Sequence, residues 1–162
     1  MKKHILSHEY YNDPSSQRLV DYLESHVEGL ENATIYYHYP IIRELDEELK
    51  YPSLLLISPH HGVILFKCDG INKIREDEDI DNLIDELSRL EDLLFSKLIK
   101  SQNKKMKSGK RALSFNLSSA LFIPNYQDDF IKEGHVEDAD IIISNSDIKL
   151  LLEELFVEEE LE

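Results

Sequence analysis

The sequence has little cysteine and little glycine, and each shortage excludes a kind of chemistry. Cys68 is the only cysteine in 162 residues, so no disulfide can form within the chain. Its place at the end of an apolar run favours a buried thiol. The five glycines are scattered, and the chain has neither a glycine-rich phosphate-binding loop nor a Walker motif. Helicase-type ATP hydrolysis therefore cannot lie within these residues.

Long apolar runs are also missing. The longest runs are far shorter than the ~20 residues that a membrane-spanning helix needs. The first residues, MKKHILSHEYYNDP, are basic but contain only a two-residue apolar run, which is not typical of a signal peptide. We therefore expect a cytoplasmic protein without a membrane partner.

Bases are outnumbered by acids. The chain has 18 Lys and Arg against 33 Asp and Glu, which gives a net charge of −15. A chain this acidic is not, as a whole, suited to binding a phosphate backbone. The charge is uneven, because residues 76–92 contain nine acids and one base, whereas residues 97–111 contain seven bases and no acid.

Apolar periodicity predicts the elements that flank a central hairpin. We expect a helix from Pro14 to about Gly29, capped by Asp13 or Ser15. A strand over 33–39 and a polar loop over 102–110 are also expected. The clearest helix is predicted over residues 79–101. Two strands are expected after it, over 112–123 and 140–144, and a last helix over 146–156.

The stretch YPSLLLISPHHGVILFKCDG, residues 51–70, predicts that hairpin. Leu54–Ile57 and Val63–Phe66 are apolar runs of strand length, and Ser58-Pro59-His60-His61-Gly62 has turn chemistry. A continuous apolar run indicates a strand that is covered on both faces. The fold class expected from the whole pattern is α/β, with three layers and a mixed sheet flanked by helices.

The order of these elements resembles that of the nuclease-related domain, a branch of the restriction-endonuclease-like PD-(D/E)xK superfamily. The similarity is carried by residues 51–57, 62–69 and 119–125. In that family a helix and a strand precede a hairpin that carries the catalytic residues, and a long helix and further strands follow. The resemblance implies a restriction-endonuclease-like sheet, and it implies a link to superfamily 1 DNA helicase-like proteins.

The chain departs from the family at the catalytic positions. Aligned by pattern, the first acid falls on Ser53, the acid of E-x-K on Lys67, and its lysine on Asp69. Such a nuclease needs acidic groups around a divalent metal and a lysine near the attacking water. A lysine ammonium repels the metal ion, and a serine is a poor ligand for a hard cation. We therefore expect these three residues to form a degenerate site, with no cofactor; Mg²⁺ would be needed only if an unrecognised nuclease site exists.

The basic stretch is the candidate nucleic-acid contact, and a solvated helix end with a loop is its alternative. The stretch runs from Lys97 to Arg111, and no aromatic residue interleaves its bases to stack on nucleobases. Its candidate DNA-binding residues are Lys100, Lys104, Lys105, Lys107, Lys110 and Arg111. The acidic run over 76–92 could mimic DNA or engage a basic partner, but a solvated helix face explains it as well.

The histidines do not predict a metal site. His60 and His61 are adjacent, so they point apart on an extended segment and chelate poorly, and a role in the hairpin turn is favoured. The other histidines have no ligand spacing with Cys68. Tyr36, Tyr37 and Tyr39 are expected to pack on the sheet.

These observations lead to one main hypothesis and two alternatives. Residues 1–160 are interpreted as a single nuclease-related domain excised from a longer chain, and Leu161-Glu162 as vector-derived. The expected function is a catalytically inactive regulatory, docking or DNA-guiding module that works with a helicase-type ATPase in the same chain or in trans. The alternatives are an active metal-dependent nuclease with an unrecognised site, and an acidic protein-interaction module without a DNA role.

Overall fold

A six-stranded mixed sheet forms the centre of the protein in the computed structural model. The structure describes residues 1–26, 29–39, 52–69, 77–99, 107–109, 112–113, 117–124, 140–142 and 145–157. The sheet has the order β1-β2-β3-β4-β7-β8, and only β3 runs antiparallel to its neighbours. The strands are β1 (Lys2–His4), β2 (Thr34–Tyr37), β3 (Leu54–Ser58), β4 (Gly62–Cys68), β7 (Leu117–Phe122) and β8 (Asp140–Ile142).

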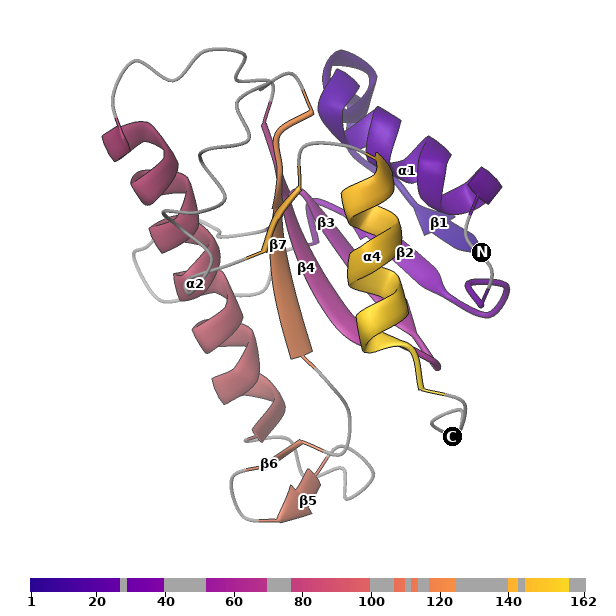
Figure 1. Ribbon diagram of the computed structural model, residues 1–162, viewed down its shortest axis with the longest axis vertical. Helices are drawn as coiled ribbons and strands as arrows, with labels where there is room; N and C mark the ends of the chain where they lie inside the picture. The colour runs from indigo at the N-terminus through magenta and orange to yellow at the C-terminus, as the bar shows by residue number, and fades with distance from the viewer. Residues whose placement is uncertain are drawn as a thin grey trace.

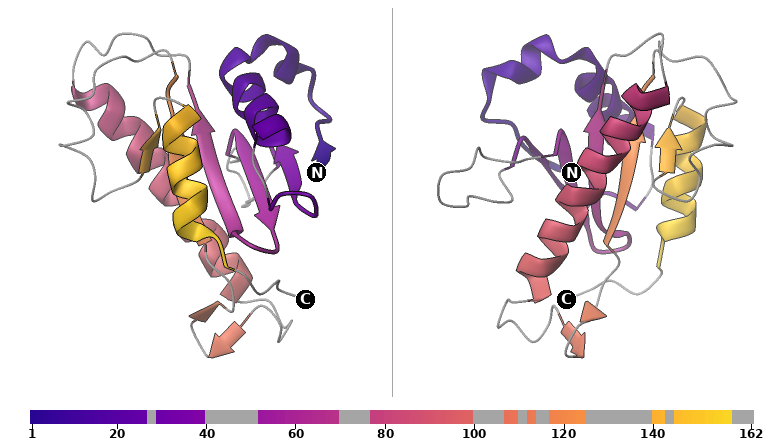
Figure 2. Two further views of the ribbon diagram at one scale, coloured as in Figure 1. Left: turned by 45° about the vertical axis from the view of Figure 1, so that its right-hand side comes forward. Right: turned by 90° about the vertical axis from the view of Figure 1, so that its left-hand side faces the viewer.

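Helices cover both faces of this sheet. The helices α1 (Pro14–His26) and α4 (Asn145–Leu155) lie on one face, and α2 (Asp77–Ile99) lies on the other (Figure 1; Figure 2). The remaining elements are a 3₁₀ helix, η1 (His8–Asn12), and a small separate ribbon of β5 (Lys107–Gly109) and β6 (Ala112–Leu113). No helix in the described ranges is long and apolar enough to cross a membrane.

The hairpin of β3 and β4 lies at the centre of the sheet, as its continuous apolar runs predict. Leu54 pairs with Phe66 and Ser58 with Gly62, so three residues form the loop. His61 N donates to Ser58 O at 3.2 Å, and Gly62 follows with a φ of 79°. Glycine adopts this left-handed conformation without a Cβ clash, which suits the position where the chain leaves the turn and enters β4.

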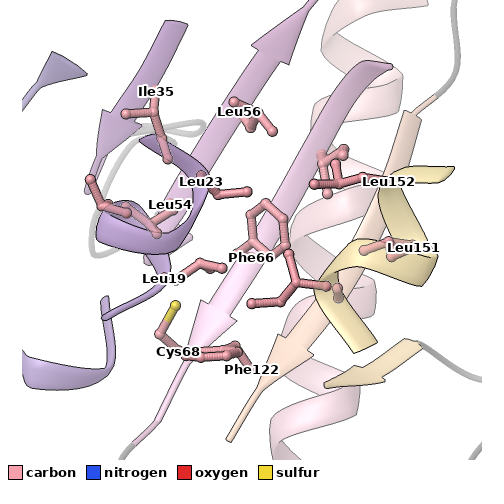
Figure 3. Packing of buried hydrophobic residues seen from close by; sticks show 14 of the residues in the cluster. Leu19, Leu23, Ile35, Leu54, Leu56, Phe66, Cys68, Phe122, Leu151 and Leu152 are labelled. Atoms are coloured by element: carbon pink, nitrogen blue, oxygen red, sulfur yellow. The ribbon is translucent and has the colours of Figure 1, made fainter. Parts of the chain in front are cut away.

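Side chains alternate between two cores across the sheet. The first core contains the leucines of α1 and α4 together with Leu54, Leu56 and Phe66, and Figure 3 shows the Phe66 ring at its centre. The second core joins Leu55 and Leu65 to the leucine stripe of α2. Because β3 and β4 supply both cores, their residues are apolar at nearly every position.

The structure confirms an α/β fold with a mixed sheet flanked by helices, and it differs from the sequence prediction in detail. The single strand expected over 112–123 is wrong, since β6 and β7 belong to different sheets. The expected polar loop over 102–110 contains β5 at its end. The elements β1 and η1 were not expected, because each is too short to carry a periodic pattern. Residues 158–162, including the expected vector-derived pair, lie outside the described ranges.

Candidate functional site

The candidate site lies at the edge of the sheet where the parallel strands end. There the carboxyl ends of β2 and β4 meet the start of β3 and the first turn of α1. In open α/β sheets, ligands commonly bind beyond the carboxyl ends of the strands. The three positions aligned with the nuclease motif, Ser53, Lys67 and Asp69, all belong to segments that reach this edge.

Ser53 is held by the backbone of the neighbouring strand. Its Oγ accepts a hydrogen bond from Cys68 N at 2.9 Å and lies 3.4 Å from Cys68 O. The residue is buried, and its own carbonyl accepts from His38 N at 3.2 Å. The hydroxyl thus satisfies a buried amide that would otherwise lose a partner at the end of the hairpin.

Lys67 contacts an acid of the long helix. Its Nζ lies 3.4 Å from Glu86 Oε1, and its side chain is the more buried of the two. The alternation of β4 places Lys67 on the face of Leu65, which α2 covers. The ammonium therefore lies on the sheet face that α2 covers, beside an acid of that helix.

Asp69 follows directly after β4 and ties the end of that strand to β7. Its backbone N donates to Phe122 O at 3.0 Å.

Ser119 on β7 donates from its Oγ to Glu91 Oε2 at 2.7 Å, so α2 supplies a second acid to the face on which Lys67 lies. The described residues contain no group of three or more His, Cys, Asp or Glu side chains arranged to hold a metal ion.

Asp13 links the first turn of α1 to β2 at this edge, on the sheet face that α1 covers. Its carboxylate caps α1 by accepting from Ser16 N at 3.2 Å and from Ser16 Oγ at 2.7 Å. The same carboxylate accepts from Tyr37 OH at 2.9 Å. Burial, and next the hydrogen bond to Asp13, raise the pKa of Tyr37 above its ordinary value. The phenol therefore stays protonated and acts as a donor.

Cys68 is a buried thiol beside this network, as its sequence position predicts. Burial raises the pKa of Cys68, and the nearby Ser16 side chain opposes this effect. A protonated, enclosed thiol is a poor nucleophile and a poor metal ligand. Its role at this edge is packing in the first core.

His38 is the strained residue of the site. Its φ is 54°, in the left-handed region that side chains rarely occupy, and its Nδ1 lies 3.2 Å from Glu9 Oε2. The ring stacks on Tyr37 with centroids 3.8 Å apart. Burial lowers the pKa of His38, against the raising effect of Glu9. Strain of this kind persists only where the surroundings enforce it.

The histidines of the turn lie at the other end of the hairpin and contact the end of the described chain. His61 Nδ1 is 2.8 Å from Ser58 Oγ. His60 Nδ1 is 2.8 Å from Val157 O, and Val157 N donates to His60 O at 2.7 Å. Both rings contact Phe156. Both histidines therefore make their contacts at the hairpin turn, which is the role that the sequence favours for them.

Most of the predicted basic contact residues fall outside the described ranges. This applies to Lys100, Lys104, Lys105, Lys110 and Arg111. Lys97 is in the last turn of α2, and Lys107 begins β5. The figures place the β5–β6 ribbon near the C-terminal end of α2 (Figure 1; Figure 2).

Sequence reasoning missed the partners of the motif residues. Glu86, Glu91, Glu9 and His38 all contact this edge, yet each lies far along the chain from its partner. The only available signal was the stripe of α2, which predicts the helix face but not its register on the sheet. No family model, curated protein or solved structure matches the chain.

Proposed function

We propose that this chain is a catalytically inactive nuclease-related domain that serves as a docking or DNA-guiding module of a helicase-like protein. The observation that carries the proposal is the hairpin end itself. There Lys67 and Ser53 stand where metal-binding acids are expected, and each already has a structural partner.

The order of elements supports the resemblance on which the proposal rests. The order α1, β2, β3, β4, α2 and β7 follows the helix, strand, hairpin, long helix and strand that the family implies. The hairpin also occupies the centre of the sheet, where the family carries its catalytic residues. The link to a helicase-type ATPase comes from this resemblance.

The contacts of the motif residues argue for inactivity in physical terms. The Lys67 ammonium bears a positive charge on the face where a divalent cation would need negative ligands. Its salt bridge pairs that charge with the Glu86 carboxylate of α2. The Ser53 hydroxyl is buried and bonded to the backbone, so using it as a metal ligand would break the end of the hairpin.

A cleavage assay tests the loss of catalysis. The whole chain is incubated with plasmid DNA and with linear duplex, in Mg²⁺ or Mn²⁺, beside Lys67→Ala, Asp69→Ala and Glu86→Ala. We expect no metal-dependent cleavage by any of these proteins. Cleavage by the unchanged chain that is lost in one of these variants would overturn the proposal and identify an active nuclease.

A titration tests the DNA role. Duplex DNA is titrated with the unchanged chain and with a Lys104→Glu, Lys105→Glu, Lys107→Glu triple variant. We expect binding that weakens as salt rises and that is lost in the triple variant, because each lysine releases counterions from the phosphates. Lys149→Glu, on the exposed side of α4, is the control for adding negative charge. Absence of any DNA binding would leave the acidic protein-interaction module as the better reading.

A further inference from the structure

Three aromatic rings form a continuous row on the sheet face that α2 covers only in part. The rings of His4 on β1 and Tyr36 on β2 stack with centroids 4.8 Å apart and planes 14° apart. The Tyr39 ring lies 5.2 Å from Tyr36 at 59°. We refer to these three residues as the aromatic row.

The outer members of the aromatic row are exposed. Tyr39 is 47% exposed and His4 is exposed, whereas Tyr36 is half-buried against the second core. On this face α2 packs over β4 and β7, and no described helix lies over β1 and β2 (Figure 2). Beside the row, Ile57 of β3 is 42% exposed.

The strand that begins the row is basic, although the protein as a whole carries a charge of −15. Lys2 and His4 alternate with Lys3 along β1, so they share a face. Lys3 points to the opposite face, where its Nζ lies 2.8 Å from Glu24 of α1. Lys2 therefore places a positive charge on the same face as the aromatic row.

Exposed rings beside a positive charge form the combination that single-stranded nucleic acid recognises. Bases stack on aromatic side chains irrespective of sequence, while nearby lysines hold the phosphates. The basic stretch 97–111 contains no aromatic residue, so it cannot supply stacking. The fold brings the two features together on β1 and β2 instead.

We infer that the aromatic row binds single-stranded nucleic acid. One base stacks on the His4 end and one on the Tyr39 end, and Lys2 contacts a phosphate of the same strand. This inference rests on the proposed DNA-guiding function and names the form of nucleic acid and the surface that holds it. The chemistry is shared by DNA and RNA, so the experiment contains both.

The test measures fluorescence polarisation of labelled dT20 and U20 at 50 and 200 mM salt. The variants are Tyr39→Ala, Tyr39→Phe, His4→Ala with Tyr39→Ala, and Lys2→Glu. Loss of one stacked base weakens binding roughly tenfold in Tyr39→Ala and further in the double variant, whereas Tyr39→Phe keeps the wild-type affinity. Lys2→Glu weakens binding and lowers the salt dependence. Equal binding of dT20 and U20 means that the site recognises bases and phosphates in either nucleic acid. A preference for one probe identifies whether the site binds DNA or RNA.

The matched control is Tyr11→Ala, which removes a 75% exposed tyrosine from η1, outside the row. Circular dichroism establishes that each variant is folded, and the half-buried Tyr36 is left unchanged for this reason. The inference fails if the unchanged chain binds neither strand, if the double variant binds as tightly as the unchanged chain, or if Tyr11→Ala has the same effect as Tyr39→Ala. Self-association that Tyr39→Ala abolishes, without strand binding, would assign the row to a contact between copies and would also overturn it.

Duplex binding separates this inference from the proposed function. If duplex DNA binds through the lysines at 104, 105 and 107 but row variants do not affect single strands, only the aromatic row loses its role. If neither duplex nor single strands bind, the DNA-guiding function fails as well.

Discussion

The Ser53 hydroxyl stabilises the end of the central hairpin. Its Oγ accepts from the buried Cys68 amide. In Ser53→Ala that amide loses its acceptor, and we expect the free energy of unfolding to fall by about 1–3 kcal/mol. Urea denaturation measures the change. Ser96→Ala, on the exposed side of α2, is the control and is expected to change stability by less than about 0.5 kcal/mol. An equal effect of the two substitutions would contradict the structural role of Ser53.

His61 makes stability depend on pH. Burial lowers the pKa of His61, and the charge of His60 lowers it further, so the folded protein resists protonation there. The unfolded chain takes up that proton near the ordinary value of about 6.5. Between the lowered pKa and this value the unfolded state binds more protons, so stability is full above about pH 6.5 and is lost as the pH falls below it.

Chemical denaturation at pH 7.5, 6.5 and 5.5 measures this dependence. We expect a shallower loss of stability on acidification in His61→Gln than in the unchanged chain. His38 contributes in the same direction, because burial also lowers its pKa, so part of the loss remains in the variant. His8→Gln, which removes an exposed histidine from η1, is the comparison, and an identical slope in the two variants would refute the assignment.

Asp13 both caps the start of α1 and hydrogen-bonds to Tyr37 of the sheet. In Asp13→Ala the cap is lost, which costs about 1 kcal/mol, and the Tyr37 hydroxyl loses its acceptor, which costs about 1–3 kcal/mol more. In a Tyr37→Phe background only the cap remains to be lost. Thermal and urea unfolding of the four proteins in this cycle measure the difference. Asp21→Ala, on the exposed side of α1, should have little effect; equal costs of Asp13→Ala in both backgrounds would disprove the link.

Phe156, just after α4, contacts the hairpin turn and packs close to Gly29. Gly29 has a φ of 89°, and a Cβ added there would lie 3.1 Å from Phe156 Cε2. We expect Gly29→Ala to destabilise the protein by about 1–2 kcal/mol from backbone strain alone, with a further steric cost. In a Phe156→Ala background the steric part should disappear and the strain should remain. Urea denaturation of the single and double variants tests this, and full additivity would mean that the ring is not the obstacle.

At the scale of elements, local patterns predict the central hairpin well and the contacts of α2 poorly. The apolar runs and the Pro59–Gly62 turn chemistry are local, so they specify β3 and β4. The Lys67–Glu86 pair joins residues 19 positions apart, and its existence depends on how α2 sits against the sheet. The run over 112–123 reads as one strand because a pattern of side chains does not reveal the partner of each segment.

The charge of the whole molecule makes its stability sensitive to salt. A net charge of −15 on 162 residues repels itself more strongly in the folded state than in the expanded chain. Since the Debye length is about 10 Å at 0.1 M salt and ~30 Å at 0.01 M, NaCl screens this repulsion. We expect the melting temperature to rise by several degrees between 10 and 150 mM NaCl. Differential scanning calorimetry measures the shift, and a melting temperature that falls with salt would show that favourable ion pairs dominate instead.

At the same scale, the fold class follows from the sequence, but the layout of the candidate site does not. Buried runs bounded by turns suffice to predict an α/β sheet between helices. The site requires β2 and β4 to end, and β3 and α1 to begin, at one edge. The aromatic row requires His4 of β1 to lie beside Tyr36 of β2. Both arrangements arise from strand order, which single-sequence patterns leave open.

The antiparallel direction of β3 also affects the order in which contacts form during folding. Among the described strands of the six-stranded sheet, β3 and β4 are the neighbours that a three-residue loop joins. The chain between β2 and β3 spans residues 38–53, and that between β4 and β7 spans residues 69–116. Closing a short loop costs less entropy than closing a long one, and local contacts form fastest. We therefore expect the β3–β4 hairpin to form early in folding, so its sequence serves folding as well as the candidate site.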